Sequence, residues 1–197
     1  MLTWIQNNFI EFFGVVTGLV YIFFSIRQNI WLWPLGIATS ALYIVVFLKA
    51  RLYADMGLQV YYLLVSLYGW YHWIYGAKEQ HREELPVIST SLQMGLRLVG
   101  AGMLMYWPIY FILIKLHSSL PIFDAFTFVT SIVATWMLAR KYIEQWWIWV
   151  VTDAIYIGMY IVKGLYLTTA LYALYTILAV IGYYEWKKKM KTESALP

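Results

Sequence analysis

Long apolar stretches alternate with short charged or polar breaks along the whole chain. Because a helix needs about 20 mostly apolar residues to cross a bilayer, each stretch predicts one transmembrane helix. Seven stretches meet this criterion: residues 8–26, 30–49, 52–75, 92–115, 121–139, 143–162 and 165–186. The one sizeable hydrophilic segment, residues 77–90, follows the third stretch and predicts a linker.

The pattern also occurs twice. Residues 11–73 align without a gap on residues 124–186, an offset of 113 positions. In an apolar chain, shared Leu or Val at a fixed offset would mean little. Here aromatic, arginine and glycine residues recur at this offset: Arg27/Arg140, Trp33/Trp146, Tyr43/Tyr156, Gly69/Gly182 and Trp73/Trp186. Internal duplication is typical of transporters that hold their substrate between two related bundles.

The duplication predicts a 3+1+3 arrangement of helices. Three crossings invert the chain, so a fourth crossing restores its direction and makes the two triplets parallel repeats, related by an axis along the membrane normal. We therefore expect an all-α integral membrane protein in three parts. These are a first three-helix repeat over 1–76, a linker and fourth helix over 77–120, and a second repeat with a basic tail over 121–197.

Composition agrees with a membrane location. Of the 197 residues, 62% are hydrophobic and 12% are charged, about half the charge of a soluble domain. The mean hydropathy is +0.66. The chain has no cysteine, which excludes disulfides and cysteine metal sites, and its three histidines are far apart in sequence. We expect neither a metal nor another cofactor.

The basic residues predict the orientation of the chain. If the N-terminus is outside, ten of the 14 lysines and arginines fall on the inside. Cytoplasmic loops carry the excess of positive charge, so we expect a multi-pass protein of the inner (plasma) membrane with its C-terminus in the cytoplasm. The four lysines between residues 187 and 191 then form a membrane anchor rather than a nucleic-acid patch.

The sixth predicted helix carries a candidate binding stripe. Trp146, Trp149, Asp153 and Tyr156 are spaced by 3, 4 and 3 residues, which places them along one side of a helix. A carboxylate inside a membrane span is unfavourable unless it faces protein or a water-filled cavity, so Asp153 indicates a functional site. The alternative is a structural hydrogen bond from Asp153 to a neighbouring helix.

The first repeat offers further candidates at related positions. Trp33 and Tyr43 lie on the second predicted helix, and Asn29 directly precedes it. Gln59 and Trp70 share a face of the third predicted helix. The Gln59 amide both donates and accepts hydrogen bonds, which suits an amide or pyrimidine edge, although a helix–helix hydrogen bond would use it equally well.

Several of these segments resemble the PnuC family of vitamin transporters. The resemblance rests on Leu52-Tyr53-Ala54, Gln59, the run Tyr68-Gly69-Trp70-Tyr71-His72-Trp73, Arg140-Lys141-Tyr142 and the pair Trp146…Trp149, and it extends over nearly the whole chain. It implies a fold similar to that of SWEET sugar transporters. It also implies facilitated diffusion of unphosphorylated B-vitamin precursors, trapping by a cytoplasmic kinase, and a homotrimer.

One residue at which this chain departs from the family pattern leaves the identity of the vitamin open. Nicotinamide riboside transporters that resemble this chain tend to have Asn where this chain has Asp153. Thiamine and nicotinamide riboside are both cationic heteroaromatics, so a carboxylate suits either of them. We therefore expect one of these two substrates rather than neutral riboflavin.

Two other classes of membrane protein compete with a transporter. A seven-helix sensor or receptor for a small aromatic ligand is the main alternative, although a retinal protein would need a lysine that residues 165–186 lack. A membrane enzyme is disfavoured, because the chain has neither an H-E-x-x-H motif nor a Ser/His/Asp arrangement. An ion-coupled pump is disfavoured because Asp153 is the one acid well placed as a proton relay.

Overall fold

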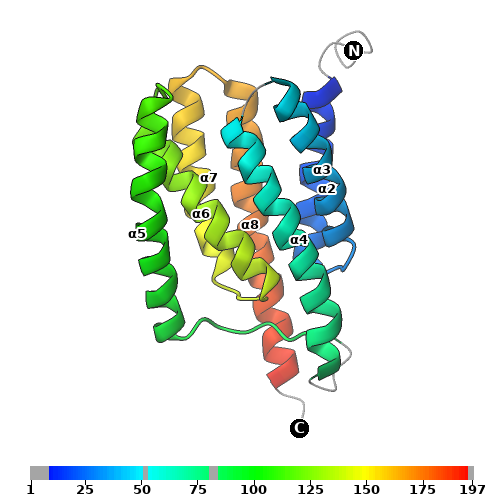
Figure 1. The fold of residues 1–197 in the computed structure, drawn as a ribbon. Helices are drawn as coiled ribbons and strands as arrows, with labels where there is room; N and C mark the ends of the chain where they lie inside the picture. Colours follow the sequence, from blue (N-terminus) through cyan, green and yellow to red (C-terminus); the bar gives the residue numbers. More distant parts are fainter. Residues whose placement is uncertain (1–8, 51–52, 80–83, 195–197) are drawn as a thin grey trace. The chain divides into compact units, whose positions relative to one another are not determined.

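The computed structural model describes residues 9–50, 53–79 and 84–194. Within these residues the chain forms seven α-helices (Figure 1): α2 (Phe9–Ile26), α3 (Leu32–Ala50), α4 (Tyr53–Glu79), α5 (Leu92–Lys115), α6 (Pro121–Ala139), α7 (Gln145–Val162) and α8 (Tyr166–Ser194). The predicted all-helical class is therefore confirmed. In the described part of the chain, α3, α5, α6 and α8 are the helices that are long and apolar enough to cross a membrane by length and composition.

Two predicted helix ends were wrong. The third predicted helix was expected to stop at residue 75, but α4 continues to Glu79, so the linker is shorter than the sequence suggested. The last was expected to stop at residue 186, but α8 continues to Ser194. Apolar content marks where a span leaves the membrane, whereas Lys, Glu and Met all favour helix and let the backbone continue into water.

The helices form two compact units, Met1–Tyr71 and His72–Pro197, with α4 contributing to both. In the first unit α2 packs on α3. The α3 backbone approaches α4 closely at Gly36, where an added Cβ would lie 2.8 Å from the Ser66 hydroxyl oxygen. The predicted three-part division of the chain remains a prediction.

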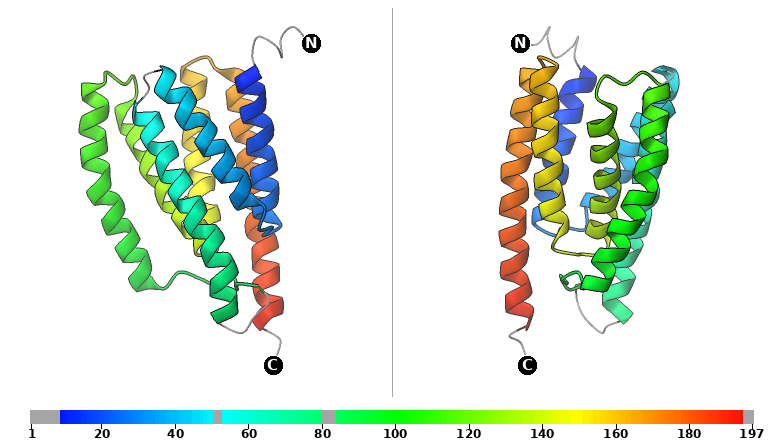
Figure 2. Two further views of the ribbon diagram at one scale, coloured as in Figure 1. Left: turned by 45° about the vertical axis from the view of Figure 1, so that its right-hand side comes forward. Right: turned by 90° about the vertical axis from the view of Figure 1, so that its left-hand side faces the viewer.

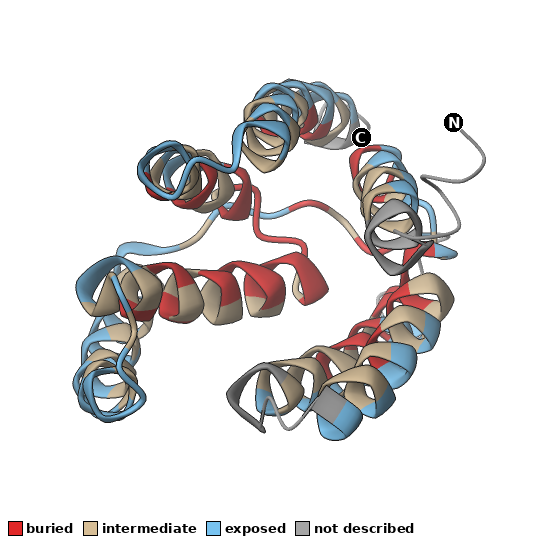
Figure 3. Cartoon of the chain, turned by 90° about the horizontal axis from the view of Figure 1, so that it is seen from above, coloured by how far each residue is buried: buried red, intermediate tan, exposed pale blue. Residues whose placement is uncertain are grey.

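In the second unit each helix packs along its neighbour in sequence: α5 on α6, α6 on α7, and α7 on α8 (Figure 2). About half of the α6 residues are buried, whereas α5 has no buried residue (Figure 3). A hydrogen bond of 2.8 Å between the hydroxyls of Thr152 and Thr130 links α7 to α6. The core of this unit therefore lies among α6, α7 and α8.

The first turn of each triplet has the same backbone geometry. Gln28 after α2 and Lys141 after α6 are equivalent at the 113-residue offset, and their φ angles are 53° and 55°. Each follows a helix end closed by the same reverse hydrogen bond: Asn29 N to Phe24 O at 2.9 Å, and Tyr142 N to Met137 O at 2.9 Å. This left-handed helix ending normally uses glycine. His117 after α5 has it as well, with φ 57° and a bond of 3.0 Å from Ser118 N to Leu113 O, so the geometry agrees with the repeat but also occurs outside it.

The linker is fastened to the turn between α6 and α7. Ile88 N donates to Lys141 O at 3.1 Å, and Ile143 N donates to Ile88 O at 3.0 Å. Thr90 donates to the Glu144 carboxylate from both its backbone N (2.9 Å) and its hydroxyl (2.7 Å). We call residues 84–90 the linker strap, because these bonds hold it against one end of the second unit.

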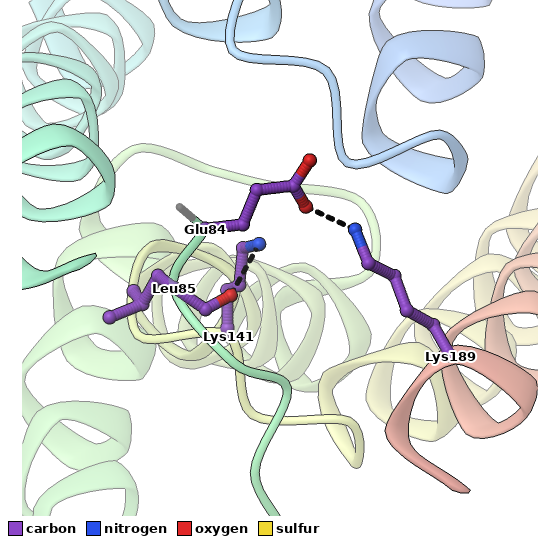
Figure 4. A network of polar contacts seen from close by, with 4 residues as sticks. All are labelled: Glu84, Leu85, Lys141 and Lys189. Carbon is purple, nitrogen blue, oxygen red and sulfur yellow. Dashed lines mark hydrogen bonds and ion pairs between the residues drawn. The ribbon is translucent and has the colours of Figure 1, made fainter. Parts of the chain in front are cut away.

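Charged side chains secure the strap further (Figure 4). The Lys141 ammonium donates to Leu85 O at 2.7 Å, and its Nζ lies 4.4 Å from the centre of the Trp73 ring. Glu84, at the start of the strap, forms an ion pair with Lys189 near the end of α8. The strap thus joins the ends of α4, the α6–α7 turn and α8.

Replacing Glu84 by Gln is expected to lower the melting temperature of the protein slightly at pH 7 and to have a smaller effect near pH 3. The hydrogen bond and ion pair with Lys189 hold the pKa of Glu84 below its usual range. A lowered pKa gives stability that is present above the carboxyl's unfolded value of about 4.3 and is lost as the pH falls through the folded value. Because the Glu84 side chain is 60% exposed, solvent screens the pair and the effect is small.

Thermal unfolding of wild type and Glu84→Gln in detergent at both pH values tests this. Added salt at pH 7 should bring the two proteins together, since it screens exposed charges. An equal difference at pH 3 and pH 7 would contradict the assignment to this ion pair.

Candidate functional site

One face of α7 concentrates its polar and aromatic residues. Gln145, Trp149, Asp153, Tyr156 and Tyr160 fall on one side of the helix, because steps of 3 and 4 residues nearly complete a helical turn. The opposite side is exposed: Trp147, Val151, Ala154, Gly158 and Ile161. We call the first group the α7 site face. It is turned towards protein, whereas the opposite side is apolar enough for lipid.

Asp153 is buried within this face, with 4% of its surface exposed. Its neighbour Thr152 is fully buried and binds Thr130 of α6, which fixes the rotation of α7 against α6. A buried carboxylate is strongly disfavoured unless a cation or hydrogen-bond donors compensate it. Asp153 is therefore the group in this region whose chemistry most requires a partner.

Three tyrosines gather beside Asp153. Ring centroids lie 4.7 Å apart for Tyr156 and Tyr172, 5.2 Å for Tyr160 and Tyr172, and 5.8 Å for Tyr156 and Tyr160. We call Tyr156, Tyr160 and Tyr172 the tyrosine cluster. It joins α7 to α8 and presents ring faces and hydroxyl groups, a combination that attracts cations and accepts hydrogen bonds.

Polar side chains lie near these rings. Tyr156 lies near Thr127 and Ser131 of α6, both buried, and near Asp124 in the first turn of that helix. Tyr172 lies near Asp153. Two carboxyl groups are thus close to the cluster, and an ionised carboxylate favours a positively charged ligand.

Comparison with known proteins identifies the family. Residues 8–188 match the family described as the nicotinamide mononucleotide transporter. The chain belongs to this family. The resemblance inferred from the sequence is confirmed, and the protein is a multi-pass membrane transporter rather than a sensor.

Individual relatives of this transporter align over most of its length. The nicotinamide riboside transporter PnuC of Escherichia coli is 25% identical over 203 residues, which cover 91% of this chain and 85% of the relative. The riboflavin/roseoflavin transporter RibM of Streptomyces davaonensis is 26% identical over 185 residues, covering 92% and 85%. A crystal structure of the vitamin B3 transporter PnuC superposes with a TM-score of 0.75 and 25% identity, covering 96% of this chain and 85% of that one.

Two of the predicted site residues of this transporter pack closely against glycines. A Cβ added at Gly182 would lie 2.6 Å from Cη2 of Trp146, and one added at Gly69 would lie 2.4 Å from Cη2 of Trp33. Trp33 and Trp146 are 0% and 2% exposed. Each indole thus lies flat over a glycine of another helix, and its part in substrate binding remains a prediction.

The other candidates of the first repeat differ in their surroundings. Asn29 is exposed and accepts a hydrogen bond of 2.9 Å from Trp31 N at the start of α3, so it shapes a turn. The ring centroid of Tyr43 lies 5.6 Å from that of Phe47 on the same helix. Gln59 is half-buried on α4 and Trp70 is 38% exposed. Their part in the transporter's substrate site remains a prediction.

The structure brings together three predicted residues, Trp149, Asp153 and Tyr156, and adds others that sequence reasoning missed. Gln145 and Tyr160 extend the same stripe by four residues at each end, so their spacing could have revealed them. Tyr172 lies on another helix, and the sequence carries no signal that would place it against Tyr156. Among the described residues of the transporter, no three His, Asp or Glu side chains are grouped to hold a metal ion.

Proposed function

We propose that this transporter mediates facilitated diffusion of a small cationic B-vitamin precursor, with nicotinamide riboside as the first candidate and thiamine as the second. The observation that carries the proposal is Asp153, buried in the α7 site face beside the tyrosine cluster. A cationic heteroaromatic ring would offset the charge of the carboxylate and find aromatic faces to stack on. The relatives named nicotinamide riboside transporters support the first candidate.

The proposed substrate-binding residues of α7 are Trp149, Asp153 and Tyr156, which share the α7 site face. Tyr43, Gln59 and Trp70 are further substrate-binding residues predicted from the sequence. Trp33, Trp146 and Asn29 also belong to the residues predicted from the sequence. In this structure the two indole rings pack on Gly69 and Gly182, and the Asn29 side chain shapes a turn.

The proposal includes the 3+1+3 architecture. All seven helices then cross the membrane, α5 links two parallel triplets, and the N-terminus lies outside the inner membrane. The matching left-handed turns at Gln28 and Lys141 and the matching Trp–Gly contacts support two equivalent triplets. The resemblance to the family adds two expectations, a homotrimer and a cytoplasmic kinase that phosphorylates and retains the product.

Transport is proposed to be passive. Among the described residues, Asp153 is the buried acid, and a gradient-driven mechanism would need further groups to bind the coupling ion. Flux into liposomes should therefore follow the substrate gradient alone and be unchanged by an imposed proton or sodium gradient. Accumulation above the external concentration in the absence of a kinase would contradict passive transport.

The alternative to these two cationic vitamins is a neutral one, riboflavin, because one relative is named a riboflavin/roseoflavin transporter. Riboflavin is neutral, so it gains nothing from pairing with Asp153. Calorimetric titration of the purified protein with nicotinamide riboside, thiamine and riboflavin separates the candidates. Tightest binding of riboflavin would overturn the cationic substrate and leave the family assignment intact.

Replacing Trp149 by Ala is expected to weaken substrate binding by about tenfold or more. Stacking of a base on an aromatic side chain contributes about 1–3 kcal/mol, and each tenfold change in affinity corresponds to about 1.4 kcal/mol. Trp147→Ala is the matched control, since Trp147 lies on the exposed side of α7. Isothermal calorimetry should find Trp149→Ala impaired and Trp147→Ala close to wild type. Equal affinities for the two variants would mean that the α7 site face does not bind the ring.

A further inference from the structure

The side-chain amide of Gln145 is buried and unpaired within the described part of the chain. The residue is 0% exposed, and neither its Oε1 nor its Nε2 has a partner among the described residues. Buried polar groups are nearly always hydrogen-bonded, and an unsatisfied amide destabilises the fold that contains it. Leu32, at the equivalent position of the first triplet, is also 0% exposed. The first triplet thus has an apolar side chain at this position, so the repeat itself does not require the amide.

The position of Gln145 on α7 suggests one. Gln145, Trp149 and Asp153 follow one another at intervals of four residues on the α7 site face. At about 1.5 Å per residue, each interval is a rise of about 6 Å. An amide, an aromatic ring and a carboxylate thus follow one another in that order on one face of the helix, over about 12 Å of its length.

We propose that Gln145 is a specificity-determining residue that recognises the carboxamide of a nicotinamide-type ligand. Its Nε2 donates to the carboxamide oxygen and its Oε1 accepts from the carboxamide nitrogen, so both unsatisfied atoms gain a bond. The pyridinium ring then lies along Trp149, with its positive charge directed towards Asp153. This inference rests on the proposed function, because it presupposes a cationic heteroaromatic substrate, and it selects nicotinamide riboside over thiamine.

The pairing predicts which analogues the protein rejects. A carboxylate in place of the carboxamide has no N–H to donate, so it leaves Oε1 of Gln145 facing a negatively charged oxygen. Sites built to hydrogen-bond a substrate group discriminate strongly against analogues that lack it, because the buried protein groups stay unpaired. Nicotinic acid riboside should therefore bind more weakly than nicotinamide riboside by at least tenfold.

The test compares wild type with Gln145→Leu, which introduces the residue found at the equivalent position of the first triplet. Calorimetric titration uses the purified full-length protein with nicotinamide riboside, nicotinic acid riboside and thiamine. The variant should bind nicotinamide riboside at least tenfold more weakly, lose the preference over the acid, and bind thiamine within about twofold of wild type. Its melting temperature without ligand should rise, since an unsatisfied amide has been removed. Gln93→Leu, on the exposed surface of α5, is the matched control and should change none of these quantities.

The possible results separate this inference from the proposed function. Unchanged affinity of Gln145→Leu for nicotinamide riboside would overturn the role of Gln145 while the cationic substrate stands. Failure of the wild type to bind nicotinamide riboside, with thiamine or riboflavin bound instead, would overturn both the role of Gln145 and the first candidate substrate. If Gln145→Leu does not fold, Gln145→Met removes the same hydrogen-bonding atoms with an unbranched side chain, and the same expectations apply.

Discussion

Replacing Asp153 by Asn is expected to weaken thiamine binding by roughly 30-fold. Asn keeps the shape of the side chain and removes its charge, so a cationic ligand loses its buried counter-charge. Losing one partner of a buried charge pair costs about 2 kcal/mol or more, and about 1.4 kcal/mol corresponds to a factor of ten in affinity. Nicotinamide riboside is also a cation, so its binding should weaken as well.

Riboflavin provides the neutral reference for this experiment, since its affinity should not depend on the charge at residue 153. Titrations of both proteins with the three vitamins give the comparison, and size-exclusion chromatography confirms that the variant is folded. If Asp153 instead forms a structural hydrogen bond to a neighbouring helix, Asn would replace it with little change for any ligand. Equal affinities for all three vitamins before and after the substitution would end its role in selectivity.

Replacing Gly182 by Ala is expected to destabilise the protein by about 1–3 kcal/mol, and Gly69→Ala should do the same. The new Cβ would lie 2.6 Å from Cη2 of the fully packed Trp146 ring, and the equivalent contact exists between Gly69 and Trp33. Overpacking of this kind forces buried side chains off their preferred rotamers or shifts the backbone, with losses of about that size. The ring cannot move aside easily, because Trp146 also packs edge-on against Trp186 at 5.5 Å.

Gly158→Ala is the matched control, since an added Cβ at this exposed position of α7 meets no atom within 4 Å. Alanine has the higher helix propensity, so this variant should be as stable as wild type or slightly more stable. Thermal unfolding of the three variants in one detergent gives the comparison. A melting temperature for Gly182→Ala equal to that of Gly158→Ala would show that the Trp146 ring yields without penalty.

The helices could be predicted from the sequence because each apolar stretch has the length that a membrane requires. Where a helix continues into water, as α4 and α8 do, apolar content no longer marks its end. The predicted helices therefore ended too early at these two places. The stripe on α7 was found from spacing alone, since Trp149, Asp153 and Tyr156 share one helical face whatever surrounds it. Periodicity shows which residues share a face of one helix. It does not show which residues of other helices that face contacts.

Contacts between helices could not be predicted from the spacing of residues along one helix. Trp146 was predicted as part of the stripe, but its ring is turned to Gly182, and only the pairing of α7 with α8 reveals this. The recurrence of both Trp and Gly at the 113-residue offset was visible, yet nothing in the sequence said that they contact each other. Tyr172 joined the site for the same reason, because its approach to Tyr156 depends on how two helices pack.

The Trp–Gly contacts also bear on how the chain is made. Trp33 contacts Gly69 and Trp146 contacts Gly182, so each contact joins residues of the same triplet. Neither contact needs residues of the other triplet in order to form. Synthesis proceeds at about 5–20 residues per second, so the 113-residue offset separates the emergence of the two pairs by roughly 6–23 s. The contact between Trp33 and Gly69 therefore has time to form before Gly182 has been translated.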